Sequence, residues 1–451
     1  MNRTITRLGL TGLALVAGAV AYAQSPTTGM ITGKVTVSGN PAAGAKVILS
    51  GPALQGARTV VTETDGSFRF SFVPSGQGYQ LVVSKSGSET VSSKNITVEP
   101  WGNLARNFKL AAAGATVEVF AAPTAVTVDN TTTVDSRTFS AEALQSIPLN
   151  NRDYMAAAYL APGVVDSGRG QANPNMSGAT GFENNYIVDG LNVTDPLLGT
   201  NNTHINTLAV ESVQIQSGGF EPEYGRATGG VISVVTKTGS NDFHGDLELT
   251  LRPKSGIAKA TAQGALAFNA ARIAEANNTT SALWVGGPLV KDKLWYSIGF
   301  SSDATNTERS YGMVYFHDPD LTINNPRTVP AGTGGTPALP AGYSNNGTSY
   351  DLKDQTQALT TKLTFSLNTD NTVELGYNNI RRTADTNILG MTFSNLAATT
   401  KFHENVDTIS LNWRSAISST WLLDVRAGSY KRKTFYDEGG QFGQAFVAGS
   451  L

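Results

Sequence analysis

The residue types that carry out catalysis or bind metals are sparse and scattered in this chain of 451 residues. It has no cysteine, which excludes thiolate nucleophiles, disulfides and cysteine-ligated metals. The four histidines lie far apart, and His403-Glu404 lacks the second histidine of an H-E-x-x-H zinc site. The sequence also contains no G-x-S-x-G nucleophile elbow, no G-x-x-x-x-G-K-[ST] phosphate loop and no G-x-G-x-x-G loop. We therefore predict that the protein is not an enzyme and has no cofactor and no metal.

The polar residues that do cluster lie between residues 211 and 245 and suggest packing and binding, not catalysis. Val213 and Ile215 alternate with Ser212, Gln214 and Gln216, which predicts a strand with two unlike faces. A β-branched run, 231–235, follows a glycine pair that would let another backbone approach closely. The candidate site residues in this motif are Glu221, Glu223, Tyr224, Gly225, Arg226, Gly229 and Gly230.

A second candidate is the strand over residues 185–188 that runs into Asp189-Gly190. Asp189 could be a ligand carboxylate, but an aspartate beside glycine is far more common in a turn, and we favour the turn. Farther upstream, Ser140 before Ala141 to Leu144 predicts a capped short helix.

The N-terminal residues 1–23 have the form of a cleaved leader. Arg3 and Arg7 precede the apolar run 8–20, and an A-x-A site ends at Ala23, so cleavage is predicted before Gln24. The apolar run is too short for a spanning helix, and no other apolar stretch of sufficient length follows. The mature chain is therefore predicted to be exported, and to enter a membrane only as a barrel.

The overall composition excludes nucleic acid as a partner. Without Arg3 and Arg7, the 33 basic residues become 31 against 35 acidic ones, a net charge of −4. A nucleic-acid-binding protein would need a basic surface. Charged residues make up 15% of the chain and glycine occurs 47 times, which indicates a polar, glycine-rich β protein.

Two sets of strands flank this central region. From residue 29 to about 110, short alternating runs separated by Gly, Pro, Asn and Asp predict a small antiparallel sandwich, with a turn at Asp65-Gly66.

From 241 onward the alternation is longer: Leu247, Leu249 and Leu251 oppose charged residues, and similar runs recur to the end of the chain. Apolar-out, polar-in strands of this kind predict an outer-membrane barrel, because a soluble sandwich would have to bury its inner charges. Residues 303–351 and 380–401 are expected to be outside loops, and Gly286-Gly287-Pro288 a turn.

These segments carry a family resemblance. The run EYGRATGGVISVVTKTGSNDFHG resembles the end of the plug domain of TonB-dependent outer-membrane receptors, and IPLNNRDYMAAAYLAPGVV resembles the entry to that plug. The run GKVTVSGNPAAGAKVILSG, with TDGSFRFSFVPSGQGYQLVVS, resembles a carboxypeptidase-regulatory-like, or carbohydrate-binding-like, sandwich. This layout is similar to that of the Oar-like branch of the family.

The resemblance implies five segments and a mainly β fold. They are a signal peptide (1–23), a small antiparallel β-sandwich (24–112), a linker (113–133), an α+β plug domain (134–240) and the first part of a transmembrane antiparallel β-barrel (241–451). The sandwich is interpreted as a folded spacer in preference to a sugar-binding module. About eight or nine strands are expected from 241–451, fewer than the roughly 22 of plugged transporters. We therefore expect an incomplete barrel from a longer receptor.

The resemblance also implies a function and partners. The function is uptake of a scarce, bulky solute across the outer membrane. The barrel is expected to be a monomer in contact with outer-membrane lipid, with the sandwich and the plug on the periplasmic side. A TonB-type inner-membrane energy-coupling complex would pull on the linker. The candidate TonB box is Thr116, Val117, Glu118, Val119 and Phe120, a short strand-forming segment that can add to a partner's sheet edge.

Two alternatives remain open. The segment 116–120 could be only the last strand of the linker. Glu221, Glu223 and Arg226 could contact the inward-facing charges of the barrel, or Arg226 could instead be a solvent-facing charge in a turn. For the whole chain, the alternative is an exported carbohydrate-binding β protein or surface adhesin without transport activity.

Overall fold

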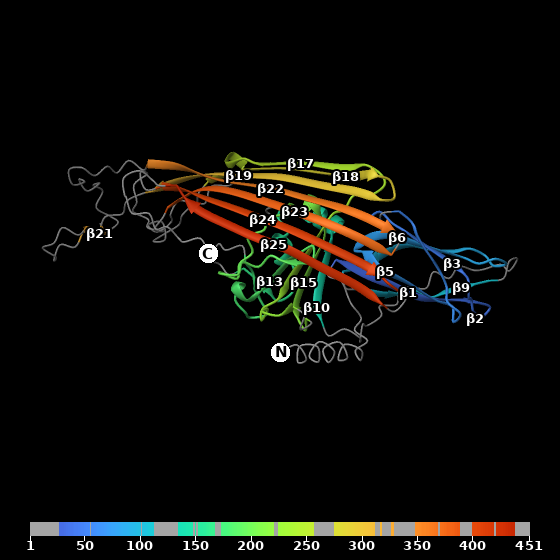
Figure 1. Cartoon of the computed structure of the whole chain (residues 1–451). Helices are drawn as coiled ribbons and strands as arrows, with labels where there is room; N and C mark the ends of the chain where they lie inside the picture. Colours follow the sequence, from blue (N-terminus) through green and yellow to red (C-terminus); the bar gives the residue numbers. More distant parts are fainter. Residues whose placement is uncertain are drawn as a thin grey trace, which may run out of the picture. The chain divides into compact units, whose positions relative to one another are not determined.

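The computed structural model of the chain consists mainly of β-strands (Figure 1), and two large hydrophobic clusters lie within its described residues. The structure describes residues 27–54, 56–100, 102–111, 134–147, 149, 152–166, 173–220, 224–256, 275–311, 316–317, 326–328, 348–368, 370–387, 399–418 and 421–437. The predicted leader, with Ala23 and Gln24, and the candidate TonB box lie outside these residues, as do Glu221 and Glu223. The helices in the described ranges are too short or too polar to serve as membrane spans.

The first core belongs to the predicted sandwich, which contains two sheets. One has the order β2(Asn40–Pro41), β1(Thr28–Val37), β5(Ser67–Pro74), and the other β4(Arg58–Val61), β3(Lys46–Ser50), β6(Gly76–Ser84), β7(Val91–Val98). Alternate side chains of these strands, such as Ile31, Val47 and Leu81, fill the space between the sheets. The prediction of a purely antiparallel sandwich needs one correction. The short strands β8(Asn103–Ala105) and β9(Phe108–Leu110) pair with β1 in parallel, because the chain crosses back before it leaves the domain.

The predicted Asp65-Gly66 turn is confirmed. The carboxylate of Asp65 accepts the backbone N–H of Ser67 at 2.9 Å, and Gly66 has a φ of 76°. Hydrogen bonds from Ser67, followed by contact with Lys34, lower the pKa of Asp65 to about 2.

The plug is a five-stranded sheet with short helices. Its order is β10(Asp135–Ser140), β15(Val210–Gly218), β16(Val231–Thr236), β13(Asn185–Val188) and β14(Leu191–Asn192). The helices are α2(Ala141–Ser146), α3(Met155–Ala158), η2(Gly181–Glu183) and η3(Thr207–Ala209), with a small hairpin of β11(Val164–Val165) and β12(Asn175–Met176). Ser140 caps α2 as predicted, since its hydroxyl accepts the backbone N–H of Ala143 at 3.3 Å.

The two faces of the plug sheet differ in chemistry but not in burial. Register places Val213 opposite Val234 and Ile215 opposite Ile232, and all four belong to the plug core. Gln214 faces Ser233 on the other side, and both are at most 5% exposed. The alternation therefore predicted unlike faces correctly, but neither face is solvated.

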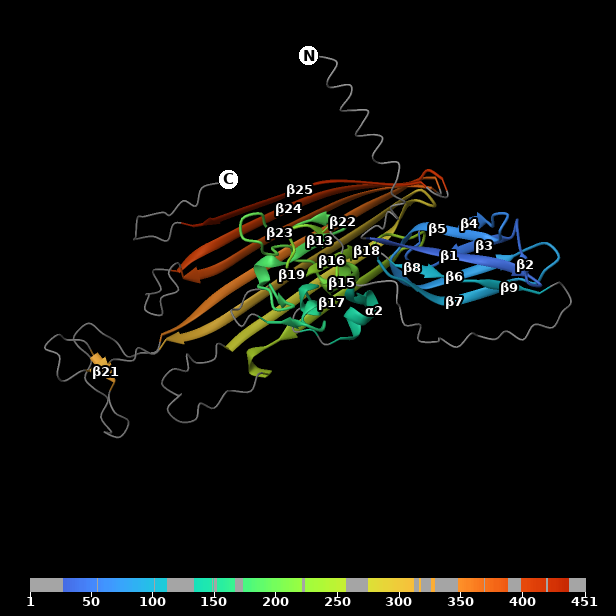
Figure 2. The same cartoon turned by 90° about the horizontal axis from the view of Figure 1, so that it is seen from below.

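Seven long antiparallel strands in the described residues form the wall, in chain order across the sheet (Figures 1 and 2). They are β17(His244–Arg252), β18(Glu275–Val290), β19(Leu294–Tyr311), β22(Thr348–Asn368), β23(Asn371–Asn387), β24(Thr399–Ala416) and β25(Leu422–Tyr436). A separate short pair, β20(Phe316–His317) and β21(Pro326–Thr328), follows β19. Side chains alternate along the wall: Lys362 and Thr364 are buried, whereas Leu363 and Phe365 are each 40% exposed.

Two expectations for the wall were wrong. Gly286-Gly287-Pro288 lies inside β18, and the turn is instead at 291–293, where Asp292 has a φ of 62°. The expected loops 303–351 and 380–401 are shorter, because β19, β22, β23 and β24 extend into them. The described part of 241–451 holds seven wall strands, six of which have 15 to 21 residues, and the expectation of about eight or nine strands for the whole segment stays a prediction.

Candidate functional site: the interface between plug and wall

A buried ion pair joins the predicted turn aspartate to the wall. Asp189 follows β13 with a φ of 47°, so the turn is confirmed. Its carboxylate accepts the backbone N–H of Thr236 at 2.9 Å, the Thr236 hydroxyl at 2.7 Å and Lys362 Nζ at 2.7 Å. Lys362, on β22, also donates to the Thr236 carbonyl at 2.8 Å. Asp189 is 3% exposed and Lys362 is 4% exposed. Because water hardly reaches either side chain, the two opposite charges neutralise each other.

A second contact places His204 between two carboxylates. One ring nitrogen contacts Asp153 of the plug, and Nε2 lies 2.7 Å from Asp303 of β19. Burial alone would lower the pKa of His204, but the charges and hydrogen bonds of Asp153 and Asp303 outweigh it and raise the pKa to about 10. The imidazole is therefore protonated at neutral pH and bridges plug and wall as a cation.

A third contact centres on Arg432 of β25. It donates to Asp195 of the plug at 2.9 Å and to Glu404 of β24 at 2.7 Å. Burial would raise the pKa of Asp195, but the backbone N–H groups of Leu198 and Leu197, and then Arg432, hold it below its ordinary value. Arg152 of the plug makes a further pair, at 2.7 Å, with Glu248 of β17.

Glycines allow the chain to pass from the plug into the wall. A Cβ added to Gly239 would lie 2.3 Å from the Tyr296 carbonyl oxygen and 2.8 Å from that of Gly287. Just beyond, the Asn241 side chain accepts Trp295 Nε1–H at 2.8 Å and donates to Asp292 at 2.6 Å. The glycine pair that had been predicted as a turn therefore provides room for a backbone crossing.

Near this crossing, Lys237 lies 4.5 Å from the centre of the Trp284 ring and 3.3 Å from Asp246. Glu211 lies at the start of β15, and the positive charges of Lys237 and Lys362 act on its carboxyl group. Burial raises the pKa of Glu211 to about 7, although both lysines lower it and Glu142 raises it further.

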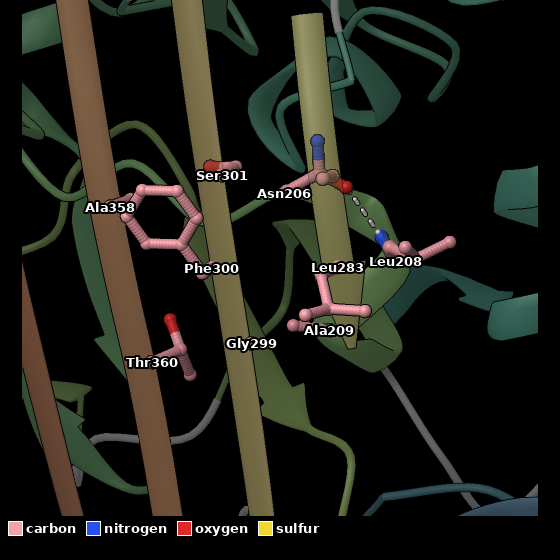
Figure 3. A pocket seen from close by; sticks show the side chains of 10 residues that line it. Asn206, Leu208, Ala209, Leu283, Gly299, Phe300, Ser301, Ala358 and Thr360 are labelled. Atoms are coloured by element: carbon pink, nitrogen blue, oxygen red, sulfur yellow. Dashed lines mark hydrogen bonds between the residues drawn. The ribbon is translucent and has the colours of Figure 1, made fainter. Parts of the chain in front are cut away.

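A small gap separates η3 from the wall (Figure 3). It is lined by Asn206, Leu208 and Ala209 of the plug and by side chains of β18, β19 and β22. Gly299 is required here, because an added Cβ would lie 2.7 Å from the Cβ of Ala209. The gap is too small to suggest a solute site. The short distance between Gly299 and Ala209 shows that the plug packs closely on the strands around it.

The predicted motif residues have separate structural roles. Tyr224 is 6% exposed, and its carbonyl accepts the Asn185 side-chain amide at 3.3 Å. A Cβ on Gly229 would lie 2.4 Å from the Asn184 side-chain oxygen, and one on Gly230 would lie 2.4 Å from Met176 Cε and 2.8 Å from the Gln216 carbonyl oxygen. Gly225 has nothing within 4 Å of an added Cβ, and Gly190 has a φ of 82°.

Arg226 is exposed, with a φ of 74°, as the alternative of a solvent-facing turn charge describes. Within the described residues, the ionic contacts between plug and wall include those of Asp189, His204, Asp195 and Arg152. Strand alternation could have placed Lys362 on the inner face of β22. No local signal could have paired it with a turn 173 residues away.

Comparison with known proteins agrees with this architecture. Residues 30–111 match the carboxypeptidase regulatory-like domain, and residues 124–231 match the TonB-dependent receptor plug domain. The chain is 31% identical, over 394 residues, to the TonB-dependent transporter Oar of Myxococcus xanthus. That alignment covers 84% of this chain and 36% of the relative, so the chain spans about a third of the relative's length.

Among solved structures, the outer membrane transporter YddB from Escherichia coli has a TM-score of 0.50 and 15% identity, covering 65% of this chain and 38% of that one. The siderophore receptor PirA from Acinetobacter baumannii has a TM-score of 0.46 and 18% identity, with 66% and 40% covered. The Oar relative and YddB are transporters, not enzymes. In its domain composition and its fold, the chain is thus similar to the Oar-like TonB-dependent receptors.

Proposed function

We propose that the chain acts in energised uptake of a scarce, bulky solute across the outer membrane. The supporting observation is the character of the contacts between plug and wall. The Lys362–Asp189, His204–Asp303 and Arg432–Asp195 pairs are ionic and hydrogen-bonded, and polar side chains can exchange partners with water when they separate. Plug and wall also share apolar packing at Ala282 and Trp284 of β18, where separation would expose apolar surface to water without such a replacement.

In this proposal the sandwich and plug face the periplasm, and a TonB-type complex engages the linker segment at 116–120. Strand addition would supply the contact, because main-chain hydrogen bonds bind an extended segment with little dependence on its side chains. Pulling on this segment would transmit force to β10, the edge strand of the plug sheet that follows the linker. The solute is a siderophore, an oligosaccharide or a peptide in this proposal.

Cell fractionation and uptake measurements test the proposal on the full-length receptor. We expect the protein to sediment with the outer membrane, with a mature N-terminus at Gln24, and uptake to stop when an uncoupler removes the inner-membrane proton gradient. A protein that remains soluble after export would instead favour a binding module. Uptake that survives the uncoupler would contradict energy coupling.

A further inference from the structure

The outward face of the wall changes chemistry along its strands. Nearer the short turns it carries apolar side chains that are 40% to 49% exposed, such as Ile298, Phe300, Leu363, Phe365, Ile409 and Leu411. Farther from the turns, the same face of β23, β24 and β25 becomes basic. Side-chain alternation places Arg381 on the face of Leu375, and Lys401 and His403 on the face of Ile409.

The basic residues of β25 share this face. Tyr430 packs on the plug core and Arg432 binds Asp195 of the plug, so both point inward. Lys431 and Lys433 alternate with them and therefore point outward, and both are exposed.

Contacts between the strands bring these residues together. The N–H of Asp437 donates to the Lys401 carbonyl at 2.9 Å, so the end of β25 lies beside the start of β24. The His403 ring stacks on Phe435 at 4.7 Å, and Lys433 Nζ lies 5.9 Å from the centre of the Phe435 ring. His403 Nδ1 is 3.3 Å from the Thr383 hydroxyl, two residues from Arg381.

The acidic side chains near this patch are already engaged. Asp437 pairs with His403 at 3.0 Å. Asp407 accepts the Tyr377 hydroxyl at 3.0 Å and the Asn379 amide at 2.7 Å, and Asp385 accepts the backbone N–H of Lys353. Within the described residues, Arg381, Lys401, Lys431 and Lys433 make no ion pair.

We propose that Arg381, Lys401, Lys431 and Lys433 form a binding surface for the phosphate groups of an anionic membrane lipid. The inference rests on the proposed function, because it requires the wall to span a bilayer. An apolar band bordered by cations matches the order of hydrocarbon and headgroup layers in a membrane. Long basic side chains can also extend to the headgroups while their stems lie along apolar surface. Each basic residue near an anionic surface contributes attraction, so four together favour a lipid that carries more than one phosphate.

The test uses the full-length receptor in bilayer discs of phosphatidylcholine, titrated with lipid A that carries two phosphates or with its dephosphorylated form. Lipid retained by the protein is measured by native mass spectrometry. In the quadruple variant R381Q/K401Q/K431Q/K433Q we expect at least about tenfold weaker retention of the phosphorylated lipid. The matched control K291Q/K293Q removes exposed charges at a short turn of the same wall and should change retention less than about twofold.

Three results would overturn the proposal. They are equal retention by the quadruple variant, equal retention of the dephosphorylated lipid by the wild type, and displacement of the lipid by millimolar inorganic phosphate, which would indicate a general anion site. Heat-modified mobility on gels confirms that each variant forms a barrel, and K431Q/K433Q replaces the quadruple variant if that one does not assemble. A receptor that fractionates as a soluble protein would contradict the proposed function itself, whereas a membrane-inserted receptor with unchanged retention contradicts this inference alone.

Discussion

At the scale of single residues, the most informative group is the Lys362 ammonium, which donates hydrogen bonds to two residues of the plug. It has the Asp189 carboxylate at 2.7 Å and the Thr236 carbonyl at 2.8 Å. A buried ion pair of this kind adds little net stability compared with apolar residues, but removal of one partner leaves the other charge without compensation. We therefore expect the pair to hold the plug in one position against the wall.

Replacement of Lys362 by methionine should loosen the plug. The Asp189 carboxylate would keep its bonds to Thr236 but lose its ion pair with Lys362, at a cost of about 3 kcal/mol. In cells with the full-length receptor, we expect sensitivity to a large antibiotic that the outer membrane normally excludes. Lys353→Met, at an exposed position of the same strand, is the control. The double variant Lys362→Met/Asp189→Asn should be less sensitive than the single one, and equal sensitivity would refute a role for the ion pair.

Two motif glycines provide a matched pair for testing the plug core. Gly230→Ala places a methyl group against Met176 and the Gln216 carbonyl, whereas Gly225→Ala meets nothing within 4 Å. Overpacking of this kind costs about 1–3 kcal/mol. Urea unfolding of the plug should therefore shift to lower concentration for Gly230→Ala and change little for Gly225→Ala. Met176→Ala should partly restore Gly230→Ala, and similar midpoints for the two glycine variants would contradict the close packing.

Glu211 should make plug stability depend on pH. Its pKa in the folded protein, about 7, is above the ordinary value of 4.5 because the carboxyl group is buried. The folded state therefore favours the protonated form, and this stabilisation is fully present below about pH 4.5 and is lost as pH rises through about 7. Glu211→Gln should raise the free energy of unfolding at pH 8 by up to about 3 kcal/mol and flatten its pH dependence between these values. If the free energy of unfolding of the wild type and of Glu211→Gln changed with pH in the same way, this account would be contradicted.

At the scale of elements, local patterns predicted the strands well and their extents poorly. The period of two predicted for the strands from 241 onward holds along β19, where Ile298 is 40% exposed and Trp295 is buried, because one buried face requires this period. Gly286-Gly287-Pro288 was mistaken for a turn, since glycine is required both by turns and by close backbone crossings. The ion pairs between plug and wall were not predictable individually, because they depend on how distant elements pack.

The linker segment offers a test of coupling at this scale. Strand addition requires main-chain donors and an extended backbone, so proline should be far more harmful than a shortened side chain. In the full-length receptor, we expect Val117→Pro or Val119→Pro to abolish energised uptake while solute still binds at the cell surface. Val119→Ala should retain most uptake. Normal uptake by both proline variants would identify the segment as a linker only.

At the scale of the whole molecule, the sandwich and the plug have separate cores. The sandwich core draws on residues from Ile31 to Leu110, and the plug core on residues from Phe139 to Trp284, with no member in common. A domain that closes its own core does not need the rest of the chain in order to fold. The plug core, in contrast, includes Ala282 and Trp284 of β18, so plug and wall share their packing.

Residues 24–112 should therefore fold when expressed alone, with one cooperative unfolding transition by circular dichroism. Val47→Ala and Leu81→Ala remove fully buried side chains from its core and should lower the free energy of unfolding, by about 2–5 kcal/mol for the leucine. Val61→Ala, at a position that is 62% exposed, is the control and should have little effect.

Deletion of 24–112 from the full-length receptor should leave heat-modified mobility of the barrel unchanged, since the plug and wall keep their shared core. An isolated sandwich without a cooperative transition, or a deletion that prevents barrel assembly, would show that the two cores depend on each other.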